Sequence, residues 1–169
     1  MDLFEEYLNK KDTYRWVKIA LTDPSFNSYR SKGIRKKDPK YEELHKPLPD
    51  NLDLALLGDA IIKFIYSDYL LDRVELLTEE KKKYESDKVF VEKIAKHYDL
   101  INYIDFDKDD SKIPHDYNYE KSKGVNSNPH KYIATAVEAM IGAIYKETNE
   151  LQSIRELLIS WITLEYFNI

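Results

Sequence analysis

Two long stretches of the sequence are apolar along nearly their whole length, and each has one acid in the middle of the run. The first is Asn51 to Tyr69, NLDLALLGDAIIKFIYSDY, with Asp59 inside it. The second is Tyr132 to Tyr145, YIATAVEAMIGAIY, with Glu138 inside it. A carboxylate in an apolar interior is unfavourable unless it has a partner. Because the chain has 31 acids and could place them elsewhere, we interpret these two as ligands of a cation.

Two of the four glycines lie inside the same helix-favouring stretches. Gly58 precedes Asp59, and Gly142 lies one helical turn after Glu138. A glycine inside a helix costs about 1 kcal/mol relative to alanine, which is acceptable where another backbone or a ligand comes close. We therefore expect the two helices to cross at the glycines and bring their acids to one site. The alternative is an ordinary core helix in which Asp59 pairs with Lys63 at i,i+4.

The other apolar positions also follow helical spacing. They predict helices over residues 2–21 (as one or two helices, ended by Pro24), 51–71, 78–85, 87–98, 132–146 and 150–167. Asp50 and Asn51 are candidate N-caps of the helix over 51–71. Residues 25–50 and 105–130 show no such period and contain prolines, so we expect a polar connection and a long loop. No alternating run indicates a strand, and the predicted fold class is all-α.

Length and composition restrict the class of protein further. A chain of 169 residues with 43% apolar content is sufficient for one core, so residues 1–169 are expected to form a single domain. The absence of cysteine excludes disulfides and cysteine-ligated zinc. The acidic N-terminus, MDLFEEYLNKKD, does not resemble a signal peptide, and the longest apolar run is too short for a membrane span. We expect a cytoplasmic protein that does not associate with membranes.

Positive charge is concentrated in one segment. The net charge of −5 argues against a nucleic-acid footprint over the whole surface. Between positions 30 and 40, however, the chain has six basic residues and one acid: Arg30, Lys32, Arg35, Lys36, Lys37, Lys40 and Asp38. Such a run of charge is typical of a loop exposed to solvent. The alternative is an arm that contacts the phosphates of a nucleic acid.

The side chains available for metal binding favour a hard cation. The four histidines are widely separated and form no HxxxH pair, so a histidine-ligated metal is not expected. No glycine-rich phosphate loop or nucleophile elbow is present. Carboxylates without histidine or cysteine are typical of Mg²⁺ or Mn²⁺ sites and hence of phosphoryl chemistry.

Three segments resemble motifs of the ribonuclease III family. LALLGDAII resembles the family's signature helix, ERLEFLGDAVL, and ATAVEAMIGAIY resembles its second acidic helix, ADAFEALIGAIY. ALTDPSF at Ala20 to Phe26 is similar to the family's ALTHRSY, and Leu77 to Leu100 is similar to the region between the acidic helices. The resemblance implies an all-α endonuclease domain that forms a homodimer about the signature helix and cleaves double-stranded RNA with Mg²⁺ or Mn²⁺.

The resemblance also implies the site residues. The family has four active-site carboxylates, in one pair four apart on the first helix and one pair three apart on the second. By position this chain keeps Asp59 and Glu138, the implied catalytic and metal-binding residues, and has Ala55 and Thr135 at the other two positions. Leu52 replaces the glutamate that begins the signature motif. The Ala and Thr replacements are similar to those of the mini-ribonuclease III subgroup, which is active without a separate double-stranded-RNA-binding domain.

We therefore expect a metal-dependent endoribonuclease that processes double-stranded RNA. The candidate RNA-binding residues are Arg30, Lys32, Arg35, Lys36, Lys37, Lys121, Lys123 and Asn126. RNA affinity supplied by a second protein is the alternative to these contacts. Ala55 and Thr135 also allow a different interpretation. In it the loss of two carboxylates has impaired catalysis, and the protein is a dimeric RNA-binding or ribosome-associated scaffold. An all-α nucleotide pyrophosphohydrolase would need more acids at helical spacing than these stretches provide.

Overall fold

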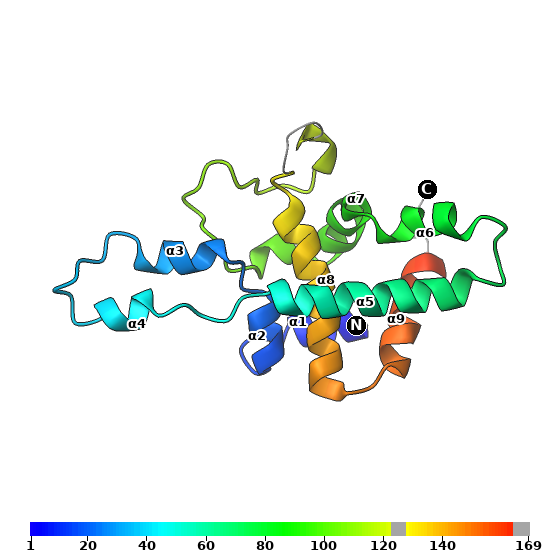
Figure 1. Cartoon of the computed structure of the whole chain (residues 1–169), viewed down its shortest axis with the longest axis horizontal. Helices are drawn as coiled ribbons and strands as arrows, with labels where there is room; N and C mark the ends of the chain where they lie inside the picture. Colours follow the sequence, from blue (N-terminus) through cyan, green and yellow to red (C-terminus); the bar gives the residue numbers. More distant parts are fainter. Residues whose placement is uncertain (123–127, 164–169) are drawn as a thin grey trace.

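Two long helices cross at the centre of the protein. The computed structural model describes residues 1–122 and 128–163, and these residues contain helices and no β-strand. The crossing helices are α5 (Leu52–Leu70) and α8 (Lys131–Thr148), as Figure 1 shows. Thr22 and Asp105 form an isolated parallel bridge that holds two distant segments together. The all-α fold predicted from the sequence is confirmed.

Shorter helices surround the crossing. In chain order they are α1 (Leu3–Leu8), α2 (Arg15–Ala20), α3 (Ser25–Ser31), α4 (Tyr41–His45), α6 (Leu77–Glu85), α7 (Asp87–Val89), a π-helix (Phe90–Ala95), two 3₁₀ turns (Leu100–Asn102 and Tyr119–Ser122) and α9 (Gln152–Thr163). None of the described helices has the length and apolar character needed to cross a membrane.

Several helix predictions are confirmed, and others need correction. The helices predicted over 51–71, 78–85 and 132–146 correspond to α5, α6 and α8, within a residue or two at their ends. Pro24 does not end the N-terminal helices, because α2 already ends at Ala20 and Pro24 occupies the N-cap position of α3. The segment predicted as one helix over 87–98 contains the π-helix. Residues 164–167 of the predicted final helix lie outside the described residues.

The start of α5 differs from the simplest capping arrangement. Asn51 holds the N-cap position, but its side chain makes no capping hydrogen bond and is fully buried. The carboxylate of Asp50 instead accepts a hydrogen bond from the backbone N–H of Leu52 at 3.2 Å. Because the backbone of Asn51 is already helical (φ −82°, ψ −4°), its side chain is directed inward rather than over the first turn.

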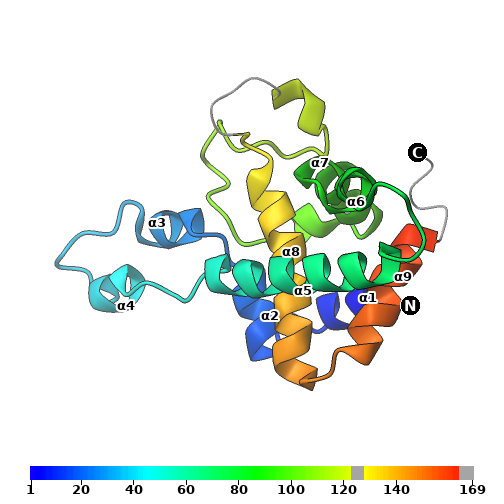
Figure 2. The ribbon, with the colours of Figure 1, turned by 45° about the vertical axis from the view of Figure 1, so that its right-hand side comes forward.

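Residues 24–50, which we call the arm, project from the body beside the N-terminus of α5 (Figures 1 and 2). The expected polar connection therefore contains two helices, α3 and α4, neither of which has a buried residue. At the root of the arm, the backbone N–H of Asn51 donates to the carbonyl of Thr22 at 3.0 Å. The chain thus leaves the body and returns to it at one place.

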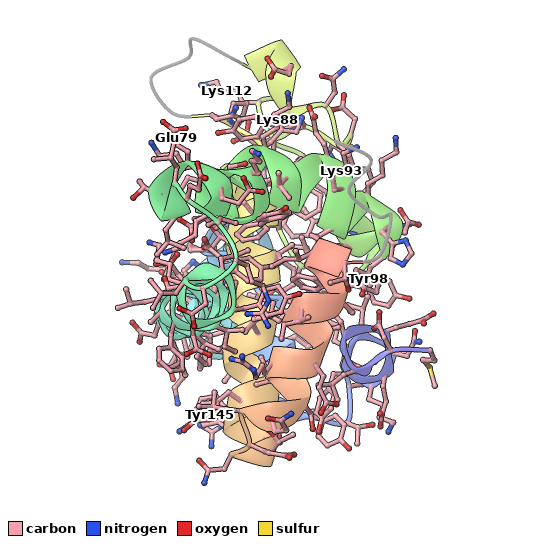
Figure 3. The ribbon with its side chains drawn as sticks, turned by 90° about the vertical axis from the view of Figure 1, so that its right-hand side faces the viewer. Glu79, Lys88, Lys93, Tyr98, Lys112 and Tyr145 are labelled. Carbon is pink, nitrogen blue, oxygen red and sulfur yellow. The ribbon has the colours of Figure 1, made fainter. Side chains whose placement is uncertain are left out.

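Both ends of the described chain meet at a cluster of aromatic rings. The rings of Phe4 and Tyr98 stack with their centroids 4.5 Å apart, and Phe4 packs against the edge of Trp161. Tyr98, labelled in Figure 3, also makes two hydrogen bonds. Its hydroxyl accepts one from the Trp161 indole at 3.1 Å and donates one to the Asp2 carboxylate. This cluster ties α1 and α9 to the middle of the sequence.

Candidate active site

Glycines allow the backbones of α5 and α8 to touch. A Cβ atom added to Gly58 would lie 1.8 Å from the carbonyl oxygen of Glu138, and one added to Gly142 would lie 2.2 Å from the carbonyl oxygen of Leu54. Real Cβ contacts at these distances do not occur, so any side chain at either position would force the helices apart. The two helices cross at Gly58 and Gly142, as the sequence predicts.

The surroundings of α8 leave one narrow face open. From Ile133 to Ile144 every residue is buried except Thr135 and Glu138, because α2, α5 and the π-helix cover the rest of the helix. A helix that is apolar on nearly all sides belongs in a core, and these two positions interrupt that pattern at a spacing of three. Thr135 and Glu138 therefore share the one face of this segment that reaches the surface.

Asp59 and Glu138 lie near each other, because Gly58, the neighbour of Asp59, touches the backbone of Glu138. Burial first, and the negative charge of Asp59 second, raise the pKa of Glu138 to about 7. Asp87 adds to this effect, whereas Lys131 and Lys63 oppose it. The charged form of Glu138 is therefore disfavoured first by burial and then by the nearby acids.

A lysine also belongs to the site. The ammonium group of Lys63 lies 2.7 Å from Oδ2 of Asp59, one helical turn away on α5. The hydrogen bond to Asp59 raises the pKa of Lys63, with further contributions from the charges of Glu85 and Glu138. The helix crossing and the i,i+4 pair, which are alternatives in the sequence, are therefore both present.

Asp87 is an acid that the sequence did not single out and whose charge acts on Glu138. It is the first residue of α7, where the hydroxyl of Ser86 accepts a hydrogen bond from the backbone N–H of Val89 at 3.4 Å. The signal was an acid in the first turn of a short helix, α7, which contacts α8. Acids are common in first turns because they interact favourably with the helix dipole, so this signal is weak by itself.

The available donors fit a hard divalent cation that keeps much of its water. Mg²⁺ is commonly held by one or two carboxylates, and Asp59 and Glu138 supply two. A cation at this place would favour the charged form of Glu138, which burial and the charges of Asp59 and Asp87 disfavour. Ala55 is buried and offers no donor, while Thr135 offers a hydroxyl on the face of Glu138. Within residues 1–122 and 128–163 no three acids or histidines are clustered closely enough to form a ligand set.

The expected RNA-binding residues whose side chains the structure describes lie in the arm, outside this site. Arg30 donates to the carbonyl of Lys46 at 3.3 Å within the arm, and Lys32 pairs with Asp109 at 3.3 Å. Arg35, Lys36 and Lys37 are exposed at the tip of the arm. The other three candidates fall outside what the structure describes, namely the side chain of Lys121 and the whole of Lys123 and Asn126.

The described residues form a helical domain in which two acids, Asp59 and Glu138, lie where α5 and α8 cross. A model of the ribonuclease III domain matches residues 52–149, which is more than half of the chain and includes α5, α8 and both acids. The chain therefore belongs to the ribonuclease III family. The arm and the ALTDPSF segment precede the matched residues. No curated protein and no solved structure matches the chain.

Proposed function

We propose that this protein is a divalent-metal-dependent endoribonuclease that hydrolyses phosphodiester bonds in double-stranded RNA. Membership of the ribonuclease III family supports an RNA-cleaving role. The single observation that carries the proposal is the convergence of Asp59 and Glu138 at the glycine crossing, where the charge of one raises the pKa of the other. Two carboxylates held this way are a suitable binding site for Mg²⁺ or Mn²⁺.

The residues of the site have separate tasks in this proposal. Asp59 and Glu138 hold the cation, and Gly58 and Gly142 fix the distance between the two helices that bear them. When bound, a divalent cation lowers the pKa of a water ligand and stabilises charge on the phosphate and the leaving oxygen. Lys63 places a fixed positive charge beside Asp59 and favours the approach of an anionic backbone.

Cleavage of a long duplex RNA, first in Mg²⁺ and then in Mn²⁺, tests the proposal. Asp59→Asn and Glu138→Gln should each lower the rate at least about 100-fold, which corresponds to losing roughly 3 kcal/mol of transition-state stabilisation. Asp53→Asn is the matched control, because Asp53 is an exposed acid on α5 outside the site. Full activity of Asp59→Asn would refute the proposed mechanism.

We further propose that the protein forms a homodimer through α5. Large apolar side chains on this helix are exposed, with Leu52 at 54%, Leu56 at 73% and Phe64 at 62%. Their spacing in steps of four and eight places them along one side of the helix, where a second copy would cover them. Leu56→Glu should give a monomer in sedimentation experiments, whereas Leu151→Glu, at another exposed leucine, should not.

A non-catalytic RNA-binding scaffold is the second candidate function. Ala55 lacks a donor at a position where the family has a carboxylate, and Lys63 already supplies Asp59 with a cation. A scaffold would bind duplex RNA without strand scission at any concentration of Mg²⁺ or Mn²⁺. The cleavage assay therefore decides between the two candidates, and a partner protein that restores binding would show where additional RNA affinity comes from.

A further inference from the structure

The tip of the arm concentrates positive charge on an acidic protein. Between positions 35 and 40 four basic residues accompany the single acid Asp38, while the whole chain has a net charge of −5. The four are Arg35, Lys36, Lys37 and Lys40, and all are exposed. A protein that is acidic overall repels a polyanion over most of its surface, so a contact with one is best made at such a projecting segment.

These four cations differ from several lysines on the body that are paired with acids. On the body, Lys10, Lys63 and Lys83 each have an acid partner three or four residues away, at 2.7 Å. The side chains of Arg35, Lys36, Lys37 and Lys40, in contrast, form no hydrogen bond or ion pair with any residue that the structure describes. Their charge is therefore available to a ligand.

The arm is braced along its length despite having no core. The side-chain amide of Asn27 both accepts from the backbone N–H of Leu48, at 2.8 Å, and donates to its carbonyl, at 3.2 Å. The guanidinium of Arg30 makes a second link across the arm, to the carbonyl of Lys46. Lys32 ties the arm to the neighbouring loop through Asp109. These bonds hold the outgoing segment (residues 24–34) and the returning segment (residues 41–50) of the arm side by side, with the tip away from the body.

The tip itself is shaped by consecutive turns. The backbone N–H of Asp38 donates to the carbonyl of Arg35 at 2.8 Å, and the Asp38 carboxylate accepts from the N–H of Lys40 at 2.9 Å. The left-handed conformation of Gly33 (φ +77°) reverses the chain just before this turn. The result is an open hollow of about 410 Å³ lined by Gly33, Arg35, Lys37, Asp38 and Pro39. Two of its five lining residues are cations, which suits a phosphate group.

We infer that the arm tip binds the phosphate backbone of duplex RNA at a second point, away from Asp59 and Glu138. The inference rests on the proposed function for its choice of polyanion. RNA is favoured over an acidic protein because the arm leads into α5, whose first residue, Leu52, lies only two helical turns (about 10 Å) before Asp59. A duplex lying on the carboxylate site can extend along the arm, and its regular phosphates match a row of cations without sequence preference.

Binding of a generic duplex RNA of about 25 base pairs, measured in EDTA at several salt concentrations, tests the inference. The tip variant Arg35→Gln/Lys36→Gln/Lys37→Gln should weaken binding roughly tenfold at moderate salt. It should also reduce the slope of log K against log salt by about 2 to 3, because each lost phosphate contact lowers that slope by about one. An unchanged slope would overturn the inference.

The control variant removes the same charge from three consecutive lysines on the body, Lys81→Gln/Lys82→Gln/Lys83→Gln on α6. It should leave the slope close to the wild-type value. An equal fall in slope for both variants would mean that total charge, rather than the arm, governs binding, and the inference would be wrong. A change of oligomeric state in the tip variant without a change of slope would assign the arm to protein contacts and would equally overturn it.

A shortened arm gives an independent measurement. Because Asn27 and Leu48 lie side by side, residues 29–46 can be replaced with a short glycine-serine linker without removing a buried residue from α3 or α4. This variant should show a salt slope reduced at least as much as that of the tip variant, because it also removes Lys40, and a wild-type slope would contradict the inference. If RNA binding depends on the arm but no cleavage occurs, the inference holds and the endonuclease proposal fails. If cleavage occurs but binding does not depend on the arm, the endonuclease proposal holds and the inference fails.

Discussion

The helix crossing and the arm are specified by opposite means. At the crossing, Gly58 and Gly142 leave no room for even a methyl group, and the helices are surrounded by buried side chains. In the arm, neither helix buries a residue, and the shape depends on turns and a few hydrogen bonds between its outgoing and returning segments. Packing therefore determines where the carboxylates lie, whereas the basic tip depends on local chemistry. The two regions should respond very differently to the same substitutions.

The largest expected effect is that of Gly58→Ala. The new methyl carbon would meet the carbonyl oxygen of Glu138 at 1.8 Å, and because that atom belongs to a packed helix it cannot move aside freely. We expect a loss of about 3 kcal/mol or more in the free energy of unfolding, measured by denaturant titration. Gly33→Ala, which adds the same methyl in open space but at φ +77°, should cost about 1 to 2 kcal/mol. Equal losses would show that the crossing is not the constraint described here.

The next effect is a dependence of stability on pH at the crossing. The folded carboxyl of Glu138 has a pKa of about 7 against an ordinary value of 4.5, so the folded state holds this proton more tightly. The resulting contribution is complete below pH 4.5 and is lost as the pH rises to about 7, a change of roughly 3 kcal/mol. Without divalent cations, Glu138→Gln should remove this loss and be the more stable protein at pH 8.

Unfolding curves at pH 5 and pH 8 check this prediction, with Asp53→Asn as the control that should retain the wild-type pH dependence. The tyrosines with raised pKa values do not contribute between these pH values, since they titrate above 10. A wild-type protein equally stable at both pH values in EDTA would show that folding does not raise the pKa of Glu138.

A smaller effect is expected from Lys63→Gln. The pair with Asp59 is partly exposed, with 54% of the lysine side chain accessible, so its loss should change stability by about 0.5 kcal/mol. Because Asp59 then lacks its cation, Mg²⁺ should raise the melting temperature more in this variant than in the wild type. Lys10→Gln removes a comparable i,i+4 pair with Glu6 and should not change the response to Mg²⁺. An identical response in both variants would exclude competition between Lys63 and the metal.

The smallest effect on stability should come from the shortened arm. Replacing residues 29–46 with a linker removes no buried residue of α3 or α4, and the free energy of unfolding should stay within about 0.5 kcal/mol of the wild type. Denaturant titration measures the difference. A loss comparable to that of Gly58→Ala would mean that the arm is part of the core, and the contrast between the two regions would fail.

The sequence is informative where burial determines structure. The long, mostly apolar runs of α5 and α8 predict both helices, and the rare glycines predict their crossing, because a glycine in a helix interior is acceptable where another backbone comes close. The helices α3 and α4 could not be predicted from periodicity, since they have no apolar face to produce one. Asp87 reaches the site through tertiary packing of α7 on α8, which no local pattern encodes. The roles of the site residues stay predictions until cleavage is measured.

The aromatic cluster at the ends of the chain has a consequence for how the domain comes apart. Because Asp2, Tyr98 and Trp161 are joined by successive hydrogen bonds, neither terminal helix can detach without disturbing the other. Fraying at one end should therefore be felt at the opposite end, and the domain should open in a single cooperative step. The emission of Trp161, whose side chain is almost completely buried, would report that step directly.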